Sequence, residues 1–177
     1  IDLPSHSWAL LQIMPELYDH SSKTQSEDIG NYKNNTINPA LPSTWDFLEK
    51  TIQEISNLFP YNLVHMGLDE RPKLSWDGSN KIKQMMKEKN LLNFEDVQDF
   101  YMNRVINLLK TSNKTTAGWN EAVLLPYKNI GSGGGSGNVD KSCLVFSWEH
   151  PDTALDVIKK GFKTVMCPGQ KTYFDMA

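Results

Sequence analysis

The sequence predicts an α/β fold built on a parallel sheet. Segments with strand-like apolar runs alternate with segments of helical periodicity, and the helical segments are long enough to act as right-handed crossovers. Carboxylates and large aromatic residues stand at or shortly after the ends of the predicted strands. Because ligands bind at the carboxyl ends of parallel strands, this pattern places the candidate functional residues at one rim of the sheet.

The helices are predicted from apolar spacing and from start and stop signals. One is expected over about residues 7–16, and a second begins at Ser43-Thr44-Trp45-Asp46, a near capping box with aspartate in place of glutamate. The buried stripe of this second helix comprises Leu48, Ile52, Ile55 and Phe59. Further helices are expected around Ile82, Met85 and Met86, over about residues 94–110 (Val97, Tyr101, Val105 and Leu108 on one face), and from Pro151 to Gly161.

Four strands are predicted, at residues 61–66, 115–119, 143–148 and 162–167. The polar stretch over residues 19–42 lacks periodicity and is expected to be a long loop. The composition of the glycine- and serine-rich segment 131–137 predicts a flexible loop or an engineered linker. The segment lacks the lysine and the spacing of a phosphate-binding loop.

Composition is typical of a globular protein and excludes several function classes. Of 177 residues, 39% are hydrophobic and 22% charged, enough for one domain with a substantial core. A net charge of −3 argues against nucleic-acid binding, which needs a basic surface. No apolar run approaches the roughly 20 residues that span a bilayer. Ile1-Asp2-Leu3-Pro4 is neither an initiator methionine nor a signal peptide, so we expect an internal segment of a longer chain.

The two cysteines are expected to be free, partly buried thiols. Cys143 opens one predicted strand and Cys167 closes another, which separates them by more than a disulfide can bridge. Asn34 and Asn113 each begin a glycosylation acceptor tripeptide, a pattern that matters only in a protein secreted by a eukaryote.

The adjacent carboxylates Asp69 and Glu70 are the strongest candidate site residues. They follow the strand at residues 61–66, where burying two charges is costly unless they are used. On a regular strand they would face opposite sides, so serving one pocket requires the chain to leave strand geometry. Gly67 makes that departure possible.

Aromatic residues and carboxylates recur at the other strand ends. The second strand ends in Trp119-Asn120-Glu121, the third ends in Trp148-Glu149, and the fourth leads into Tyr173-Phe174-Asp175. Tryptophans beside carboxylates are typical of a sugar site, in which flat apolar rings contact the C–H face and acceptors bind hydroxyls. The alternative is that Trp119 and Trp148 are core residues, but the repetition at four strands favours a site.

These motifs resemble glycoside hydrolase family 20, the β-N-acetylhexosaminidases and chitobiases. The segment from Ile1 to Ser7 is similar to the family's D-x-P-G-H-S signature, with Ser5 where glycine is usual. The segment from His65 to Glu70 is similar to H-x-G-G-D-E, with Leu68 in place of the second glycine. Trp119, Trp148 and the Tyr173-x-Asp175 pair follow in the family's order.

The resemblance implies a fold and an extent. The family fold is an eight-stranded (β/α) barrel, and residues 1–177 would be a fragment of that single catalytic domain, a partial (β/α)8 TIM barrel with about strands 3 to 7 and their helices. The missing strands would be supplied either by the rest of the barrel or by a partner chain such as a second copy. An open sheet edge is otherwise prone to aggregation.

The resemblance also implies hydrolysis of terminal non-reducing N-acetylhexosamine residues by a retaining, substrate-assisted mechanism. The substrate's 2-acetamido oxygen attacks the anomeric carbon and forms an oxazolinium intermediate. Glu70 would be the general acid and base, and Asp69 would orient the acetamido group. The remaining implied roles are donation to the acetamido oxygen by Tyr173, walls of the pocket at Trp119 and Trp148, a sugar-hydroxyl contact at Asp175, and support of the acid pair by His6 and Asp2.

The expected ligands are glycans that contain N-acetylglucosamine or N-acetylgalactosamine, without metal or cofactor, and the family resemblance implies a secreted, periplasmic or lysosomal location. Two alternatives remain open. One is a non-catalytic sugar-binding relative on the same barrel, which Leu68 and Ser5 suggest. The other is an unrelated α/β protein whose aromatic residues are all structural.

Overall fold

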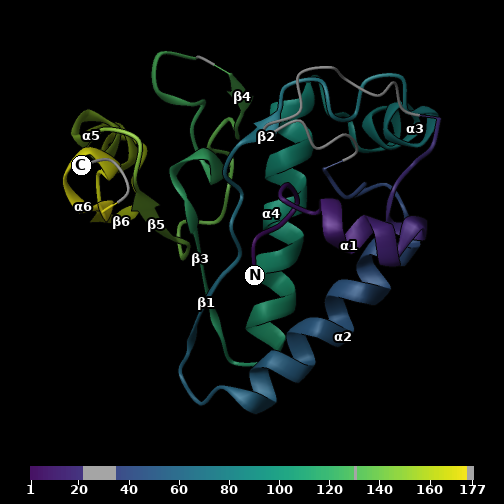
Figure 1. Ribbon diagram of the computed structural model, residues 1–177, viewed down its shortest axis with the longest axis horizontal. Helices are drawn as coiled ribbons and strands as arrows, with labels where there is room; N and C mark the ends of the chain where they lie inside the picture. The colour runs from purple at the N-terminus through teal and green to yellow at the C-terminus, as the bar shows by residue number, and fades with distance from the viewer. Residues whose placement is uncertain (22–34, 130, 175–177) are drawn as a thin grey trace.

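The computed structural model describes residues 1–21, 35–129 and 131–174, and its centre is a parallel sheet (Figure 1). The sheet runs in the order β1 (Leu63–His65), β3 (Thr115–Trp119), β5 (Leu144–Ser147) and β6 (Lys163–Met166), with every neighbouring pair parallel. A parallel bridge from Leu3 to Gly67 places the N-terminal segment beside the chain that leaves β1. The predicted α/β fold with a parallel sheet is confirmed, and three of its four strands are shorter by two or three residues than expected.

The described α-helices surround the sheet unevenly, and those that follow β1 and β5 include the ones that pack against its strands. They are α1 (Trp8–Ile13), α2 (Pro42–Leu58), α3 (Asn80–Lys89), α4 (Phe94–Thr111), α5 (Pro151–Lys159) and α6 (Gly169–Thr172). Short 3₁₀ turns occur at η1 (Pro15–Leu17), η3 (Asn120–Ala122) and η4 (Tyr127–Asn129). A separate antiparallel pair joins β2 (Arg71–Pro72) to β4 (Ser132–Gly133).

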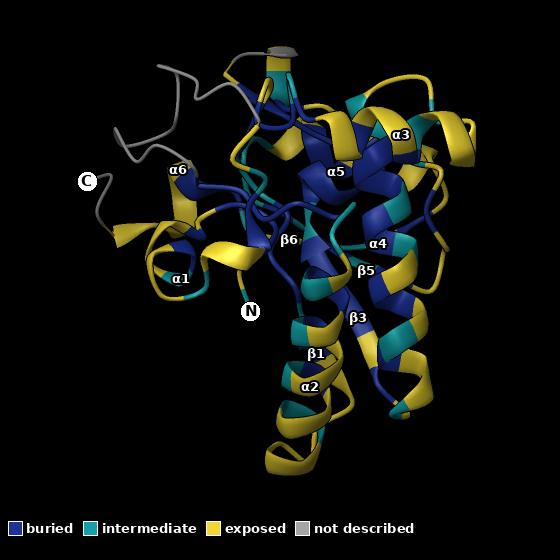
Figure 2. Cartoon of the chain, turned by 90° about the vertical axis from the view of Figure 1, so that its right-hand side faces the viewer, coloured by how far each residue is buried: buried dark blue, intermediate teal, exposed yellow. Residues whose placement is uncertain are grey.

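Helix α4 is the central helix of the core and packs against both β3 and α2. Its predicted apolar face is largely confirmed, since Val97, Tyr101 and Val105 are completely buried. At the last turn Leu109 is buried and Leu108 only partly, so the buried stripe keeps a spacing of four residues and winds around a helix of 3.6 residues per turn. Figure 2 shows the resulting alternation of buried and exposed residues along α4.

Two predicted helix boundaries are wrong, and proline explains both. The helix expected over residues 7–16 breaks into α1 and η1, because Pro15 disfavours helical geometry at Met14 (φ −125°, ψ 69°). Helix α2 begins at Pro42, where the fixed φ of proline suits the first turn. The expected capping box is therefore absent, and the Ser43 hydroxyl donates instead to the carbonyl of Glu16 at 2.7 Å.

The other predicted helices are present, with small differences in which residues they bury. Helix α3 contains the expected apolar residues, and α5 runs from Pro151 to Lys159 before Gly161 (φ +85°) ends it. In α2, Leu48 and Ile52 are buried, whereas Phe59 lies beyond the helix and is 58% exposed. Residues 22–34 of the predicted loop, which include Asn34, lie outside the described residues.

Both cysteines are free, as expected, and burial raises the pKa of Cys143 to about 12. Asn113 lies just after the end of α4, and its glycosylation stays a prediction. Among the described residues, no helix combines the length and the apolar character that crossing a bilayer requires.

The glycine-rich segment 131–137, for which a flexible loop or an engineered linker is predicted, packs into the fold. Ser132 and Gly133 form β4, and Gly133 to Gly135 are buried. A Cβ at Gly134 would lie 1.9 Å from the carbonyl oxygen of Leu124, so only glycine allows this approach. The buried carboxylate of Asp99 accepts hydrogen bonds from the Ser136 hydroxyl at 2.5 Å and the Asn138 amide at 2.8 Å. The glycines therefore serve close packing.

We expect Gly134→Ala to destabilise the protein by about 2–3 kcal/mol, because the added methyl group meets backbone that cannot rotate away. Gly131→Ala is the matched control: it lies at φ +83° with open space around its Cβ position, and should cost about 1 kcal/mol. Urea-induced unfolding of both variants measures the difference. Equal, small losses would mean that the segment yields as a flexible linker does.

Candidate active site

The chain leaves strand geometry where β1 ends, as the Asp69-Glu70 pair requires. Gly67, Leu68 and Glu70 all have left-handed backbones, with φ of 78°, 76° and 48°. This path turns both carboxylates toward one imidazole: Nε2 of His6 lies 3.3 Å from Oδ2 of Asp69 and 3.3 Å from Oε2 of Glu70. Three residues singled out by the sequence thus converge at the carboxyl end of β1.

The N-terminal segment holds this turn from the other side. The amide of Leu3 donates to the carbonyl of Met66 at 3.2 Å, and the amide of Leu68 donates back to the carbonyl of Leu3 at 3.0 Å. The contact is so close that a Cβ at Gly67 would lie 2.2 Å from Oδ1 of Asp2. Gly67 therefore serves both the left-handed turn and the approach of Asp2.

The two departures from the family signatures have local structural explanations. Ser5 is fully buried, and its hydroxyl donates to the backbone carbonyl of Asp69, which ties the N-terminal segment to the acid pair. Leu68 is also fully buried and belongs to the main hydrophobic core. Its side chain therefore adds to the core, and the carboxylates of Asp69 and Glu70 still meet at His6.

The ionisation of the cluster follows from these contacts. Hydrogen bonds to Asp69 and Glu70 raise the pKa of His6 to about 10. Burial, followed by the hydrogen bond and charge of Asp69, raises the pKa of Asp2 to about 7. Burial works against ionisation of Asp69, but its hydrogen bonds with His6 and Asp2 outweigh burial and lower its pKa. At neutral pH the cluster therefore contains an ionised Asp69 beside an imidazolium.

Asp2, His6 and Asp69 could also be considered as metal ligands, because they can present one atom each within 4.8 Å of one another. A metal requires a neutral imidazole with a free nitrogen lone pair. Nε2 of His6 instead faces two carboxylates, and its raised pKa favours the protonated ring. This cluster is better described as an ion pair between His6 and Asp69, with Asp2 hydrogen-bonded to Asp69, than as a metal centre.

The aromatic residues predicted for the site lie at the next strand ends. Trp148 and Tyr173 stack nearly parallel, with ring centroids 6.2 Å apart and an interplanar angle of 10°. The Trp119 ring packs edge-on against His65, with ring centroids 4.7 Å apart, and against Phe146, with ring centroids 6.2 Å apart. Trp119 and Trp148 are only partly buried, unlike core tryptophans such as Trp76. Asp175 lies outside the described residues, so its role stays a prediction.

Sequence reasoning placed Glu121 and Glu149 at strand ends but assigned neither a role. Glu121 is completely buried and accepts a hydrogen bond from the indole Nε1 of Trp148 at 3.0 Å. Burial, followed by the charge of Glu149, raises the pKa of Glu121 to about 8. Its sequence signal was its place two residues after Trp119, where the strand ends.

Asn120 and Glu149 form a second connection across the same strand ends. The side-chain amide of Asn120 donates to Oε2 of Glu149 at 2.6 Å, and its carbonyl oxygen accepts from the Trp148 amide at 3.1 Å. The amide of Tyr127 also donates to Oε2 of Glu149, at 2.9 Å. Trp148 is therefore held through its backbone as well as its ring.

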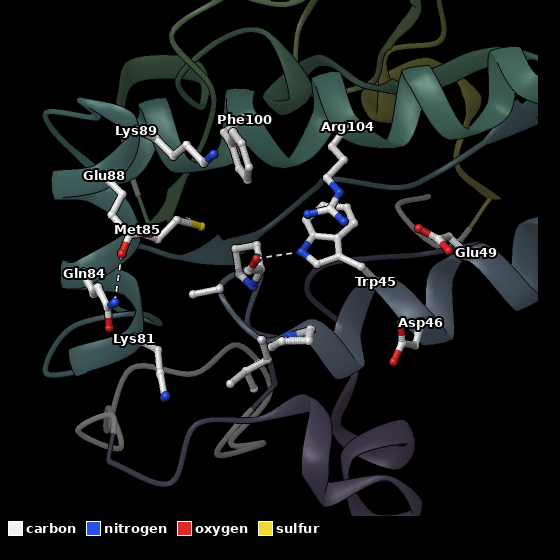
Figure 3. Close-up of a pocket in the computed structure, with 14 residues that line it drawn as sticks. Trp45, Asp46, Glu49, Lys81, Gln84, Met85, Glu88, Lys89, Phe100 and Arg104 are labelled. Atoms are coloured by element: carbon white, nitrogen blue, oxygen red, sulfur yellow. Dashed lines mark hydrogen bonds between the residues drawn. The ribbon is translucent and has the colours of Figure 1, made fainter.

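A separate pocket of about 490 Å³ lies between α2, α3 and α4 (Figure 3). The guanidinium of Arg104 lies over the ring of Trp45, with its Cζ 3.9 Å from the ring centroid, and the Trp45 indole donates to the carbonyl of Pro39 at 2.8 Å. Acidic and basic side chains both line it, and none of the strand-end carboxylates does. Its position among the helices separates it from the rim of the sheet, so we place the candidate active site at the Asp69-Glu70 pair.

Comparison with known proteins identifies the family of this chain. The model of the glycosyl hydrolase family 20 catalytic domain matches residues 1–177. A β-hexosaminidase of Vibrio furnissii is 33% identical over 178 residues, covering 100% of this chain and 27% of that protein. The human β-hexosaminidase subunit beta is 31% identical over 125 residues, covering 68% of this chain and 21% of its own.

Solved structures share the fold. The exo-β-N-acetylglucosaminidase of Vibrio harveyi, solved with N-acetylglucosamine, superposes with a TM-score of 0.83 and 30% identity, covering 96% of this chain and 25% of that one. A chitobiase of Flavobacterium johnsoniae gives a TM-score of 0.76 and 29% identity over the same shares. The chain thus spans about a quarter of the length of such relatives. The strand-end carboxylates, the partial (β/α)8 architecture and the match along the whole chain together show that this protein belongs to glycoside hydrolase family 20.

Proposed function

We propose that the protein hydrolyses terminal, non-reducing N-acetylhexosamine residues of glycans with retention of anomeric configuration, using the substrate's acetamido group as the nucleophile. The observation that carries this proposal is the convergence of Asp69 and Glu70 on His6 at the carboxyl end of β1. Membership of the family adds the reaction class, since such enzymes are substrate-assisted exceptions to the two-carboxylate scheme.

In this reaction Glu70 protonates the glycosidic oxygen as the bond to the anomeric carbon breaks. The acetamido oxygen forms a new bond to that carbon, and Glu70, now a carboxylate, later takes a proton from the water that opens the oxazolinium ring. Its partly exposed side chain is accessible to both substrate and water. His6 contacts Oε2 of Glu70 and fixes the position of the carboxyl group.

Asp69 accepts the acetamido N–H and stabilises the positive charge that develops on the oxazolinium ring. Its lowered pKa supports this role, because Asp69 is then ionised at neutral pH, and the ionised carboxylate can accept the N–H and stabilise the positive charge. His6 and Asp2 hold the group in place through their hydrogen bonds. The acetamido group itself would lie between the rings of Trp119 and Trp148, with the Tyr173 hydroxyl donating to its oxygen and Asp175 binding a sugar hydroxyl.

We further propose that residues 1–177 are one fragment of a single catalytic (β/α)8 barrel. Among the described residues, β6 pairs with β5 on one side only, and Val165 and Met166 on it are 38% and 58% exposed. Such an edge calls for another strand of the same barrel or of a partner chain. Activity is therefore to be tested in the complete natural protein that carries these residues.

The test compares nitrophenyl N-acetyl-β-glucosaminide and N-acetyl-β-galactosaminide with the nitrophenyl β-glucoside, which lacks the acetamido group. We expect release of nitrophenol from the acetamido sugars, no release from the glucoside, and an initial β-anomeric product by proton NMR. Quenching of tryptophan fluorescence by N-acetylglucosamine without any hydrolysis would instead identify a non-catalytic sugar-binding relative. Hydrolysis of the glucoside at a similar rate would contradict substrate assistance.

A further inference from the structure

Glu121 lies at the junction of two strand ends that supply the candidate site. It follows β3 in η3, and its two carboxyl oxygens reach different neighbours. Oε2 accepts from the indole Nε1 of Trp148 at 3.0 Å, after β5, and Oε1 accepts from the backbone amide of Glu70 at 3.4 Å, after β1. One side chain thus touches both the acid-bearing segment and the aromatic wall.

The backbone of Glu121 is held as firmly as its side chain. Its carbonyl oxygen accepts from the side-chain amide of Gln98 on α4 at 2.8 Å and from the backbone amide of Gly135 at 2.7 Å. The side-chain oxygen of Gln98 accepts from Nε of Arg71 at 2.6 Å, and its amide also reaches the carbonyl of Leu68 at 3.4 Å. Gln98 therefore links Glu121 to residues on both sides of the Asp69-Glu70 pair.

We propose that Glu121 is a positioning residue, whose carboxyl group keeps the Trp148 indole and the Glu70 backbone in register across the two strand ends. The inference rests on the proposed function for its consequence in catalysis. Because Trp148 would wall the acetamido pocket, a tilt of its ring would misalign the nucleophilic oxygen, and small displacements of a reacting group are costly. In this role Glu121 acts mainly through the Trp148 indole at 3.0 Å, since its contact with the Glu70 amide at 3.4 Å is longer and weaker.

A matched series of variants separates this role from burial alone. Glu121→Gln keeps an oxygen that can accept from the indole, whereas Glu121→Leu leaves the indole N–H without its protein partner. We expect kcat/KM on a nitrophenyl N-acetyl-β-glucosaminide to fall less than about 3-fold in the first variant and at least about 10-fold in the second. Asp99→Asn, at another buried carboxylate, should lower the melting temperature without changing kcat/KM.

A double-mutant cycle identifies the partner. Trp148→Phe removes the indole donor, so in that background Glu121→Leu should lower kcat/KM by less than about 3-fold. Losses that multiply in the double variant, or an equal loss in Glu121→Gln and Glu121→Leu, would overturn the proposal. Should Glu121→Leu fail to fold, the Gln variant and a spectroscopic measurement still decide the matter.

The spectroscopic measurement needs no turnover, so it distinguishes failure of this inference from failure of the proposed function. The Trp148 indole N–H resonance is identified as the one missing from Trp148→Phe. In the unmodified protein this resonance should shift as Glu121 titrates, with a midpoint near its pKa of about 8. The titratable groups that interact with Glu121 are Glu149, Asp69 and Tyr173. Glu121→Gln should abolish the shift. A resonance that responds to pH identically in both proteins would contradict the contact in solution.

Discussion

Replacement of Glu70 by Gln is expected to lower kcat of the complete protein by about 10²–10⁴-fold, the usual contribution of a general acid-base. The amide preserves the shape of the side chain and its place beside His6 but cannot donate a proton to the glycosidic oxygen. The loss in the first step should be smaller on nitrophenyl glycosides, whose leaving group needs little protonation, than on chitobiose. Steady-state assays on both substrates measure the difference.

Glu49→Gln is the matched control for this prediction, because it makes the same substitution at a residue that lines the separate pocket between α2, α3 and α4 (Figure 3). Its turnover should equal that of the unmodified protein. A Glu70→Gln protein that cleaves chitobiose at the unmodified rate would remove Glu70 from the role of general acid.

Replacement of Asp69 by Asn is expected to lower kcat by about 10²–10³-fold while leaving KM nearly unchanged, since the charge matters most once the oxazolinium forms. A thiazoline analogue of that intermediate should bind the unmodified protein well and the variant poorly. Inhibition constants measured on residual activity, or calorimetric titration, report the comparison. Equal affinity of the two proteins for the thiazoline would argue against substrate assistance.

The same variant should change the dependence of stability on pH. The pKa of His6 is raised from 6.5 to about 10, so its pairing with the carboxylates stabilises the fold fully below pH 6.5 and is lost as the pH rises through 10. Asp69→Asn removes one of its two carboxylate partners. The difference in melting temperature between the two proteins should therefore be larger at pH 6 than at pH 10.

The location of the candidate site could be predicted from the sequence because its signal is local. An apolar run, a glycine and two adjacent carboxylates lie within ten residues, so the residue types by themselves predict the departure from strand geometry at Gly67. The alternation of strands and helices likewise follows from periodicity over short windows. The roles of Asp69 and Glu70 remain predictions that the two substitutions test.

The errors arose where composition and local pattern compete with packing. Segment 131–137 has the composition of a linker, yet its glycines allow close approach to Leu124 and Ala122. Helix α2 begins at Pro42 instead of at the capping pattern of Ser43, and the Ser43 hydroxyl donates to the carbonyl of Glu16, 27 residues away. Neither outcome is visible in a short window, because the partners of both segments come from outside it.

The sequence alone determined the fold class and the rim at which the candidate site lies, because apolar periodicity and glycine placement act over a few residues. Only the tertiary structure decided what surrounds the acid pair. Ser5 reaches the carbonyl of Asp69 across 64 residues, and Glu121 reaches the indole of Trp148 across 27. Burial makes these contacts matter, since a polar group removed from water needs a partner, and the identity of that partner depends on which strand ends the fold brings together.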